Sequence, residues 1–84
     1  MTAASNAISN YSLYSSDGCH LCELALDICM PLITKEQLNV VDIVGDDNLV
    51  ALYGVHIPVL ERMSDGEKLF WPFTAEQAST LFTL

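Results

Sequence analysis

Apolar positions in the first half of the chain follow the period of a helix. One set recurs every three or four residues, the spacing of a single helix face: Leu21, Leu24, Ala25, Ile28, Cys29 and Leu32. This spacing predicts a helix from about Cys19 to Thr34, with that stripe facing inward. Pro31 lies inside the pattern. Because proline lacks an N–H and clashes with the carbonyl four residues back, we expect a kink there.

Four short runs of β-branched and aromatic residues predict strands. The first covers residues 12–15, and the second covers residues 38–44, where a β-branched run is typical of a buried parallel strand. Residues 55–63 lead into a third strand. The Asp65-Gly66 pair predicts a hairpin to a fourth antiparallel strand over residues 68–73. Pro72 near its end indicates an edge strand.

Two further helices carry recognisable ends. Asp46 or Asp47 can cap a short helix over residues 47–53, with Gly54 as its stop. Thr74 and Gln77 have the spacing of a capping box and start a last helix to about Thr83. Its inward positions are expected to be Ala75, Ala78, Leu81 and Phe82. The predicted order is β-α-β-α-β-β-α, and its first three elements form a right-handed βαβ unit.

Length and charge narrow the class of protein. Eighty-four residues make one domain, and three basic against eleven acidic residues give a net charge of −8. Nucleic acid and anionic membranes are poor partners for such a surface. No apolar run approaches the ~18 residues of a membrane span. Residues 1–10 lack the features of a secretory signal, so we expect a flexible N-terminal tail at 1–10 and one domain over 11–84.

The candidate chemistry lies in Cys19-His20-Leu21-Cys22, at the predicted junction of a strand and a helix. A C-x-x-C motif at that place in an α/β pattern is typical of a dithiol redox site. Cys29, seven residues after Cys22, is on the apolar side and is interpreted as a small buried hydrophobe. Three cysteines and no export signal favour a reducing compartment, hence a cytoplasmic location.

The motif Gly18-Cys19-His20-Leu21-Cys22-Glu23, followed by Tyr53-Gly54-Val55-His56-Ile57-Pro58-Val59-Leu60, resembles the thioredoxin/glutaredoxin superfamily, and within it the small glutaredoxin-like proteins. The resemblance implies a thioredoxin-like three-layer α/β/α fold with a four-stranded mixed sheet. It also implies a cis peptide bond at Pro58 facing the dithiol, with Ile57 offering backbone groups to an extended substrate. His20 and His56 would then lie beside the bound substrate, although a lone His such as His56 is also common as a solvated surface residue.

The sequence departs from the glutaredoxins that use glutathione. Those proteins carry Cys-Pro-Tyr-Cys, a basic residue shortly before the motif, and a Gly-Gly turn before the last helix. Here the pair between the cysteines is His20-Leu21, residues 14–17 contain no basic residue, and residues 70–75 contain no glycine. A glutathione site is therefore not carried over.

The position of the two thiols assigns their roles. A helix start favours an anion, so we expect the pKa of the Cys19 thiol to be lowered modestly, although Asp17 and Glu23 oppose this. Cys19 is predicted to be the nucleophile and Cys22 the resolving thiol in disulfide exchange. No cofactor is expected beyond the redox-active Cys19–Cys22 disulfide. The predicted partners are a disulfide-containing protein or small thiol substrate and an unidentified reductase or thiol donor.

The sequence is also compatible with functions other than disulfide exchange. The pair can be two helical cysteines without a redox task, in a non-catalytic module that binds an extended peptide at Ile57 and Pro58. Cys19, His20, Cys22 and Cys29 are also possible zinc ligands, and two copies could share an iron–sulfur cluster through Cys19 and Cys22. Because the second cysteine pair of a structural zinc site is absent, no metal ligand is assigned.

Overall fold

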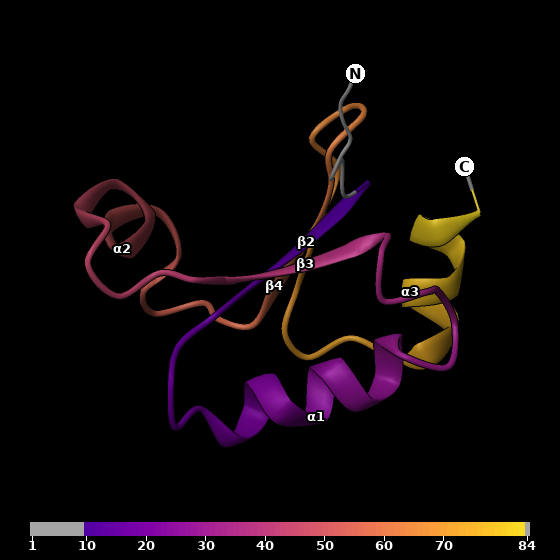
Figure 1. Cartoon of the computed structure of the whole chain (residues 1–84), viewed down its shortest axis with the longest axis horizontal. Coiled ribbons are helices and arrows are strands. Elements are labelled where there is room, and N and C mark those ends of the chain that lie inside the picture. The colour runs from indigo at the N-terminus through magenta and orange to yellow at the C-terminus, as the bar shows by residue number, and fades with distance from the viewer. Residues whose placement is uncertain (1–9, 84) are drawn as a thin grey trace.

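A four-stranded mixed sheet forms the centre of the fold (Figure 1). The computed structural model describes residues 10–83. The central strand β2 (Tyr11–Ser15) lies between β3 (Leu38–Asp42), to which it is parallel, and β4 (Val59–Arg62), to which it is antiparallel. The last strand, β5 (Lys68–Phe70), pairs antiparallel with β4. The strand order is therefore β3-β2-β4-β5, with β3 and β5 at the edges.

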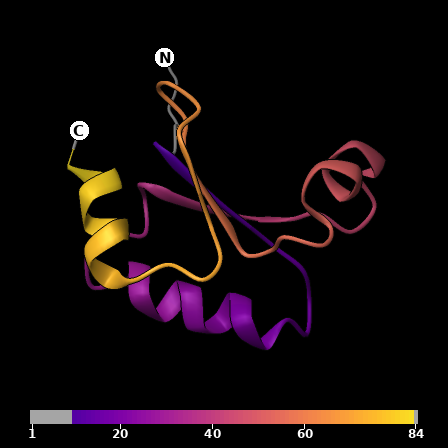
Figure 2. The same ribbon diagram turned by 180° about the vertical axis from the view of Figure 1, so that it is seen from behind.

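Three helices cover the two faces of the sheet, as Figures 1 and 2 show from opposite sides. They are α1 (His20–Cys29), α2 (Asp47–Tyr53) and α3 (Ala75–Phe82). Alternate residues of β2 point to opposite faces, so Leu13 packs toward α1 and α3 while Tyr14 packs toward α2. The predicted order β-α-β-α-β-β-α and the three-layer thioredoxin-like class are confirmed.

Each face of the sheet has its own hydrophobic cluster. The larger one joins β2 and β4 to α1 and α3 through Tyr11, Leu13, Ala25, Cys29, Leu38, Leu60, Phe73, Ala78 and Leu81. The smaller one joins the sheet to α2 through Tyr14, Ile43, Tyr53 and Val59, with Tyr14 stacked on Tyr53 at 4.5 Å between ring centroids. All five residues of β2 are buried, as expected for a strand covered on both faces.

Helix α1 is shorter than predicted and is not kinked. It ends at Cys29, and the N–H groups of Leu32 and Ile33 both turn back to the Cys29 carbonyl. Pro31 follows this end, so the prediction of a kinked helix reaching Thr34 was wrong. Because Pro31 has no N–H to continue the ladder, the turns after Cys29 close the helix instead.

The buried face of α1 is also rotated from the predicted stripe. Leu21, Leu24 and Leu32 are 46%, 40% and 37% exposed. The buried residues of the helix are Cys22, Ala25 and Cys29. These side chains are small, which lets the helix axis come close to the sheet and leaves the larger leucines at the margin.

Strand β3 is an edge strand that ends at Asp42, and Leu38 is its only buried residue. The prediction of a buried strand reaching Val44 was therefore wrong, because β4 occupies the other side of β2. The third and fourth strands are likewise shorter than predicted, ending at Arg62 and Phe70. The edge position predicted for the fourth strand is confirmed, with Pro72 beyond its end in a second cis X-Pro bond, Trp71–Pro72.

The predicted ends of α2, the predicted start of α3 and the predicted hairpin are confirmed. The Asp46 carboxylate accepts from the N–H groups of Asn48 and Leu49, and Thr74 with Gln77 forms a capping box. Gly66 takes a positive φ of 78° in the turn between β4 and β5. On α3, Ala78 and Leu81 are buried as predicted, whereas Ala75, the first residue of the helix, is exposed.

Most of the predicted tail, residues 1–9, lies outside the described residues. Within residues 10–83 no helix is long and apolar enough to cross a membrane.

Candidate functional site

A tight turn carries the chain from the centre of the sheet to the cysteine pair. Strand β2 ends at Ser15, and Gly18 in the following turn has a φ of 77°, a left-handed conformation that suits glycine. The Cys19 N–H donates to the Ser16 carbonyl at 3.2 Å. Cys19 therefore occupies the N-cap position of α1, one residue earlier than the first turn predicted for it.

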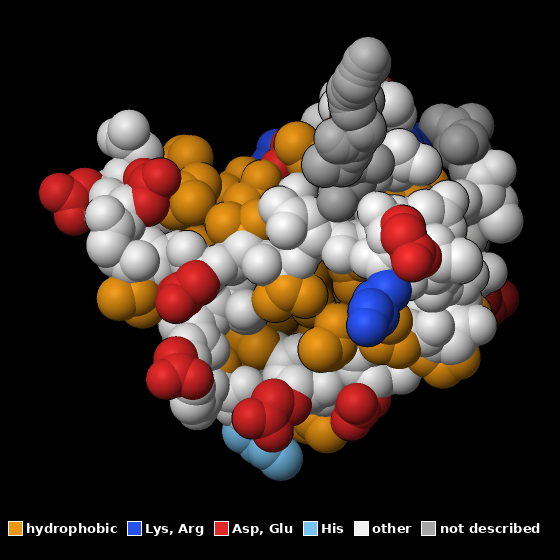
Figure 3. Space-filling model, viewed as in Figure 1, with side chains coloured by type: hydrophobic (Ala, Val, Ile, Leu, Met, Phe, Trp, Pro, Cys, Tyr) orange, Lys and Arg blue, Asp and Glu red, His pale blue; other side chains and the backbone are white. Residues whose placement is uncertain are grey.

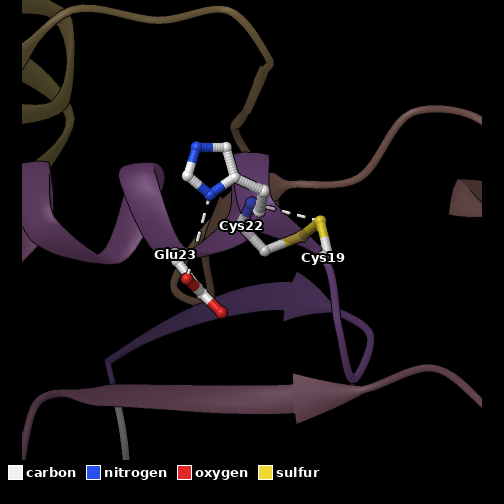
Figure 4. The surroundings of a disulfide bond; sticks show 4 residues. Cys19, Cys22 and Glu23 are labelled. Carbon is white, nitrogen blue, oxygen red and sulfur yellow. Dashed lines mark hydrogen bonds and ion pairs between the residues drawn. A yellow bond between two sulfur atoms is a disulfide. The ribbon is translucent and has the colours of Figure 1, made fainter.

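Cys19 and Cys22 form a disulfide at the N-terminus of α1, with their Cα atoms 5.2 Å apart (Figure 4). The backbone N–H of Cys22 donates to Cys19 Sγ at 3.1 Å, so the sulfur takes the place of a capping oxygen. Cys22 is only 5% exposed, whereas Cys19 is half-buried. The two sulfurs thus differ in their access to solvent and in their hydrogen bonding.

The charges around the pair are mixed. His20 Nδ1 lies 4.0 Å from Glu23 Oε1, and both side chains are largely exposed (Figure 4). When the disulfide is reduced, the positive end of the α1 dipole favours a thiolate at Cys19. The Asp17 and Glu23 carboxylates act in the opposite direction.

The Ile57–Pro58 bond is cis, and it precedes β4. Tyr14 of β2 pairs with Val59 of β4. Pro58, the residue before Val59, therefore lies level with the end of β2, where the turn to Cys19 begins. Pro58 is buried, and Ile57 packs against the smaller core cluster. His56 is exposed and lies edge-on to Phe70, with 5.3 Å between ring centroids. The substrate-binding role of His20, His56, Ile57 and Pro58 stays a prediction.

Cys29 lies apart from the pair, in the larger core cluster. It is fully buried, and burial raises the pKa of its thiol to about 11. A buried thiol that stays protonated is a poor nucleophile. The interpretation of Cys29 as a small core residue is confirmed.

A cavity of about 410 Å³ lies on the β3 side of the disulfide. Its walls come from the turn, from α1 and from the end of β3, and they include Leu13, Ser15, Asp17, Cys19, Cys22, Glu23, Leu26, Val40 and Asp42. Sequence reasoning missed this cavity, and with it Ser15, Val40 and Asp42. Asp42 could have been found from the βαβ unit, because it pairs in register with Ser15 once β3 is ended at the correct residue.

No group of three or more His, Cys, Asp or Glu side chains in the described part of the chain is placed to hold a metal ion. Of the possible zinc ligands, Cys19 and Cys22 are joined in the disulfide, whereas Cys29 is buried in the core.

The chain is similar to a known protein family and to solved structures. The family model of the glutaredoxin-like domain (DUF836) matches residues 11–82. The X-ray structure of Northeast Structural Genomics target protein XcR50 from X. campestris is 32% identical and has a TM-score of 0.76, over 86% of this chain and 93% of that one. The solution structure of the same target gives a TM-score of 0.75 at 32% identity, over 87% and 91% of the two chains. A search of the curated proteins gives no significant match.

Proposed function

Because the chain belongs to the glutaredoxin-like domain (DUF836) family and brings Cys19 and Cys22 within disulfide distance, we propose that it is a thiol–disulfide oxidoreductase. The observation that carries the proposal is the disulfide itself, at the N-cap of α1, with one sulfur half-buried and the other buried. Pairs of this kind cycle between dithiol and disulfide, with the helix end favouring the thiolate.

The difference in exposure supports the assignment of roles. Cys19 is the more accessible sulfur and accepts the Cys22 N–H, which stabilises a negative charge on it. Cys22 is 5% exposed, so an incoming disulfide reaches it less readily. Cys19 is therefore the nucleophile, and Cys22 resolves the intermediate.

The reaction proceeds in two exchanges. The Cys19 thiolate attacks one sulfur of a substrate disulfide, forming a mixed disulfide and releasing the other sulfur as a thiolate that takes up a proton. Cys22 then loses its proton and attacks Cys19 Sγ, which expels the second substrate thiol and closes the Cys19–Cys22 disulfide. The substrate disulfide is reduced to two thiols, the protein is oxidised, and a separate reductase or thiol donor must restore the dithiol.

The loop before β4 supports a place for the substrate. The cis Ile57–Pro58 bond stands level with the end of β2, and the exposed His56 lies beside it. An extended substrate would lie along Ile57 and Pro58, between His20 and His56. The activity fits a reducing compartment such as the cytoplasm, where the third thiol, Cys29, stays free.

Trapping with a Cys22→Ser variant tests the proposal. Without its resolving thiol, the variant should retain the mixed disulfide at Cys19, visible as an adduct by intact-mass spectrometry after mixing with a model disulfide such as bis(2-hydroxyethyl) disulfide. The reduced wild-type protein should instead lose two alkylatable thiols and carry no adduct.

The matched controls are Cys19→Ser and Cys29→Ser. Cys19→Ser should form no stable adduct, and Cys29→Ser should behave as the wild type, because Cys29 is buried in the core. If the reduced wild-type protein is not oxidised by the model disulfide and Cys22→Ser traps none, the protein is a non-catalytic binding module instead.

A further inference from the structure

The dithiol can be approached from two sides of the central strand. The Ile57–Pro58 segment lies on the β4 side of β2, whereas the 410 Å³ cavity lies on the β3 side, with Cys19 and Cys22 in its wall. Its volume is in the range of small-molecule sites, roughly 300–1,000 Å³. Figure 3 shows hydrophobic side chains in the hollow between α1 and β3, with acidic side chains to the left of it and below it and a basic side chain at its right edge.

The lining of the cavity carries charge of one sign. Asp17, Glu23 and Asp42 supply three carboxylates, and no Lys or Arg is among the residues that line it within residues 10–83. The three residues come from the turn, from α1 and from the end of β3, and Asp42 Oδ1 also accepts the Val44 N–H at 2.9 Å. His20, next to Cys19, has its Nδ1 4.0 Å from Glu23 Oε1.

A buried hydroxyl gives the cavity a second polar feature. Ser15 shares the face of β2 that Leu13 presents to α1, and it is only 9% exposed. Its hydroxyl lines the cavity and has no hydrogen-bond partner among the described residues. Because a buried hydroxyl without a partner is costly, this group indicates a site that a polar ligand or water completes.

We propose that this cavity selects small disulfides that carry aliphatic ammonium groups as oxidants of the dithiol. The inference rests on the proposed function and adds the substrate class to it. The ammonium group would be held by the carboxylates of Asp17, Glu23 and Asp42, with the Ser15 hydroxyl as a further polar contact. The methylene groups would lie on Leu26 and Val40, which presents the substrate disulfide to Cys19. Anionic disulfides such as glutathione disulfide would be repelled.

The chemistry balances without another reagent. One reduced protein and one cystamine (the disulfide of 2-aminoethanethiol) give one Cys19–Cys22 disulfide and two molecules of 2-aminoethanethiol. Cys19 attacks one cystamine sulfur and expels the first aminothiol, and Cys22 then expels the second.

The test measures the second-order rate of oxidation of the pre-reduced protein by three disulfides: cystamine, neutral bis(2-hydroxyethyl) disulfide and anionic 3,3′-dithiodipropionate. Free thiols are quenched by alkylation and counted by mass. The variant Asp17→Asn/Glu23→Gln/Asp42→Asn removes the three charges. The matched control Glu36→Gln/Asp47→Asn/Glu76→Gln removes three exposed acidic charges that do not line the cavity.

The deciding quantity is the ratio of the cystamine rate to the neutral rate, compared between proteins so that intrinsic reactivity and the pKa of Cys19 cancel. We expect this ratio to fall by about tenfold in the cavity variant at low ionic strength and to change little in the control. An equal fall in both variants, or no fall in either, would overturn the inference while leaving the proposed function intact. If none of the three disulfides oxidises the protein, the proposed function fails first and the inference with it.

Discussion

At the scale of single residues, three cysteines of one chain have three environments. Cys19 is half-buried and accepts an N–H, Cys22 is nearly covered, and Cys29 is fully enclosed by the core. Burial alone raises the pKa of the Cys29 thiol to about 11, which keeps it out of exchange at neutral pH. Position on one helix therefore separates a candidate nucleophile, a resolving thiol and a core side chain.

We expect the negative charge of Glu23 to raise the pKa of the Cys19 thiol. Glu23→Gln should lower the pKa of the Cys19 thiol in the reduced protein, because it removes a negative charge from the first turn of α1. The change should be less than about one pH unit, since the side chain is exposed and screened. The pH dependence of the alkylation rate with iodoacetamide measures it.

Asp27→Asn is the matched control for this prediction. Asp27 is exposed on the same helix, one turn further from Cys19, so its removal should change the midpoint less. Equal shifts in the two variants, or an upward shift in Glu23→Gln, would contradict the prediction.

At the scale of elements, the sequence predicted the helix caps and the turns, because interactions between neighbouring residues determine them. Helix α2 begins at the cap that Asp46 provides, and the β4–β5 turn has Gly66 where a positive φ is needed, so both follow from a few adjacent residues. The inward face of α1 and the edge position of β3 depend on neighbours far along the chain. The predicted inward stripe therefore left out Cys22, which is buried, and the cavity beside Asp42 was missed.

One ion pair secures the β4–β5 hairpin. Arg62 Nε and Nη2 donate to the two oxygens of Asp65 at 3.0 and 2.6 Å, and Asp65 also accepts from the Glu67 N–H. A third donor, Arg62 Nη1, reaches the Leu81 carbonyl in α3 at 3.0 Å. The hairpin is thus joined to the last helix through one buried guanidinium.

This ion pair predicts an acid-sensitive contribution to stability. The hydrogen bond from Arg62 lowers the pKa of Asp65 from 3.8 to about 2. The Asp65 carboxyl group therefore has a lower pKa in the folded protein than in the unfolded chain. Its contribution to the free energy of unfolding is present above pH 3.8 and is lost as the pH falls toward 2. Urea unfolding of wild type and Asp65→Asn should differ most at pH 5, and the difference should shrink toward pH 2. A difference that is constant over this range would contradict the assignment.

At the scale of the whole molecule, the excess of acidic groups is the dominant electrostatic feature. The net charge is −8, and two of the three basic residues, Arg62 and Lys68, already lie beside Asp65 and Glu61. Most of the carboxylates therefore repel one another across a small surface, which disfavours the compact state.

Salt should consequently stabilise the protein. Raising NaCl from about 20 to 500 mM shortens the Debye length from roughly 20 Å to about 4 Å, and we expect Tm to rise at pH 7. Thermal unfolding followed by circular dichroism measures it. The rise should vanish near the isoelectric point, which is the control. A Tm that falls with NaCl at pH 7 would show that attractive ion pairs outweigh the repulsion.

The central place of β2 has a consequence for synthesis of the chain. This strand comes first among the strands described, yet its antiparallel neighbour β4 follows only at Val59–Arg62. During translation, β2 and the cysteine turn leave the ribosome long before the strand that completes their sheet. Both thiols are then exposed on an unfolded nascent chain, so a reducing environment during synthesis protects them from pairing with the wrong partner until residue 62 emerges.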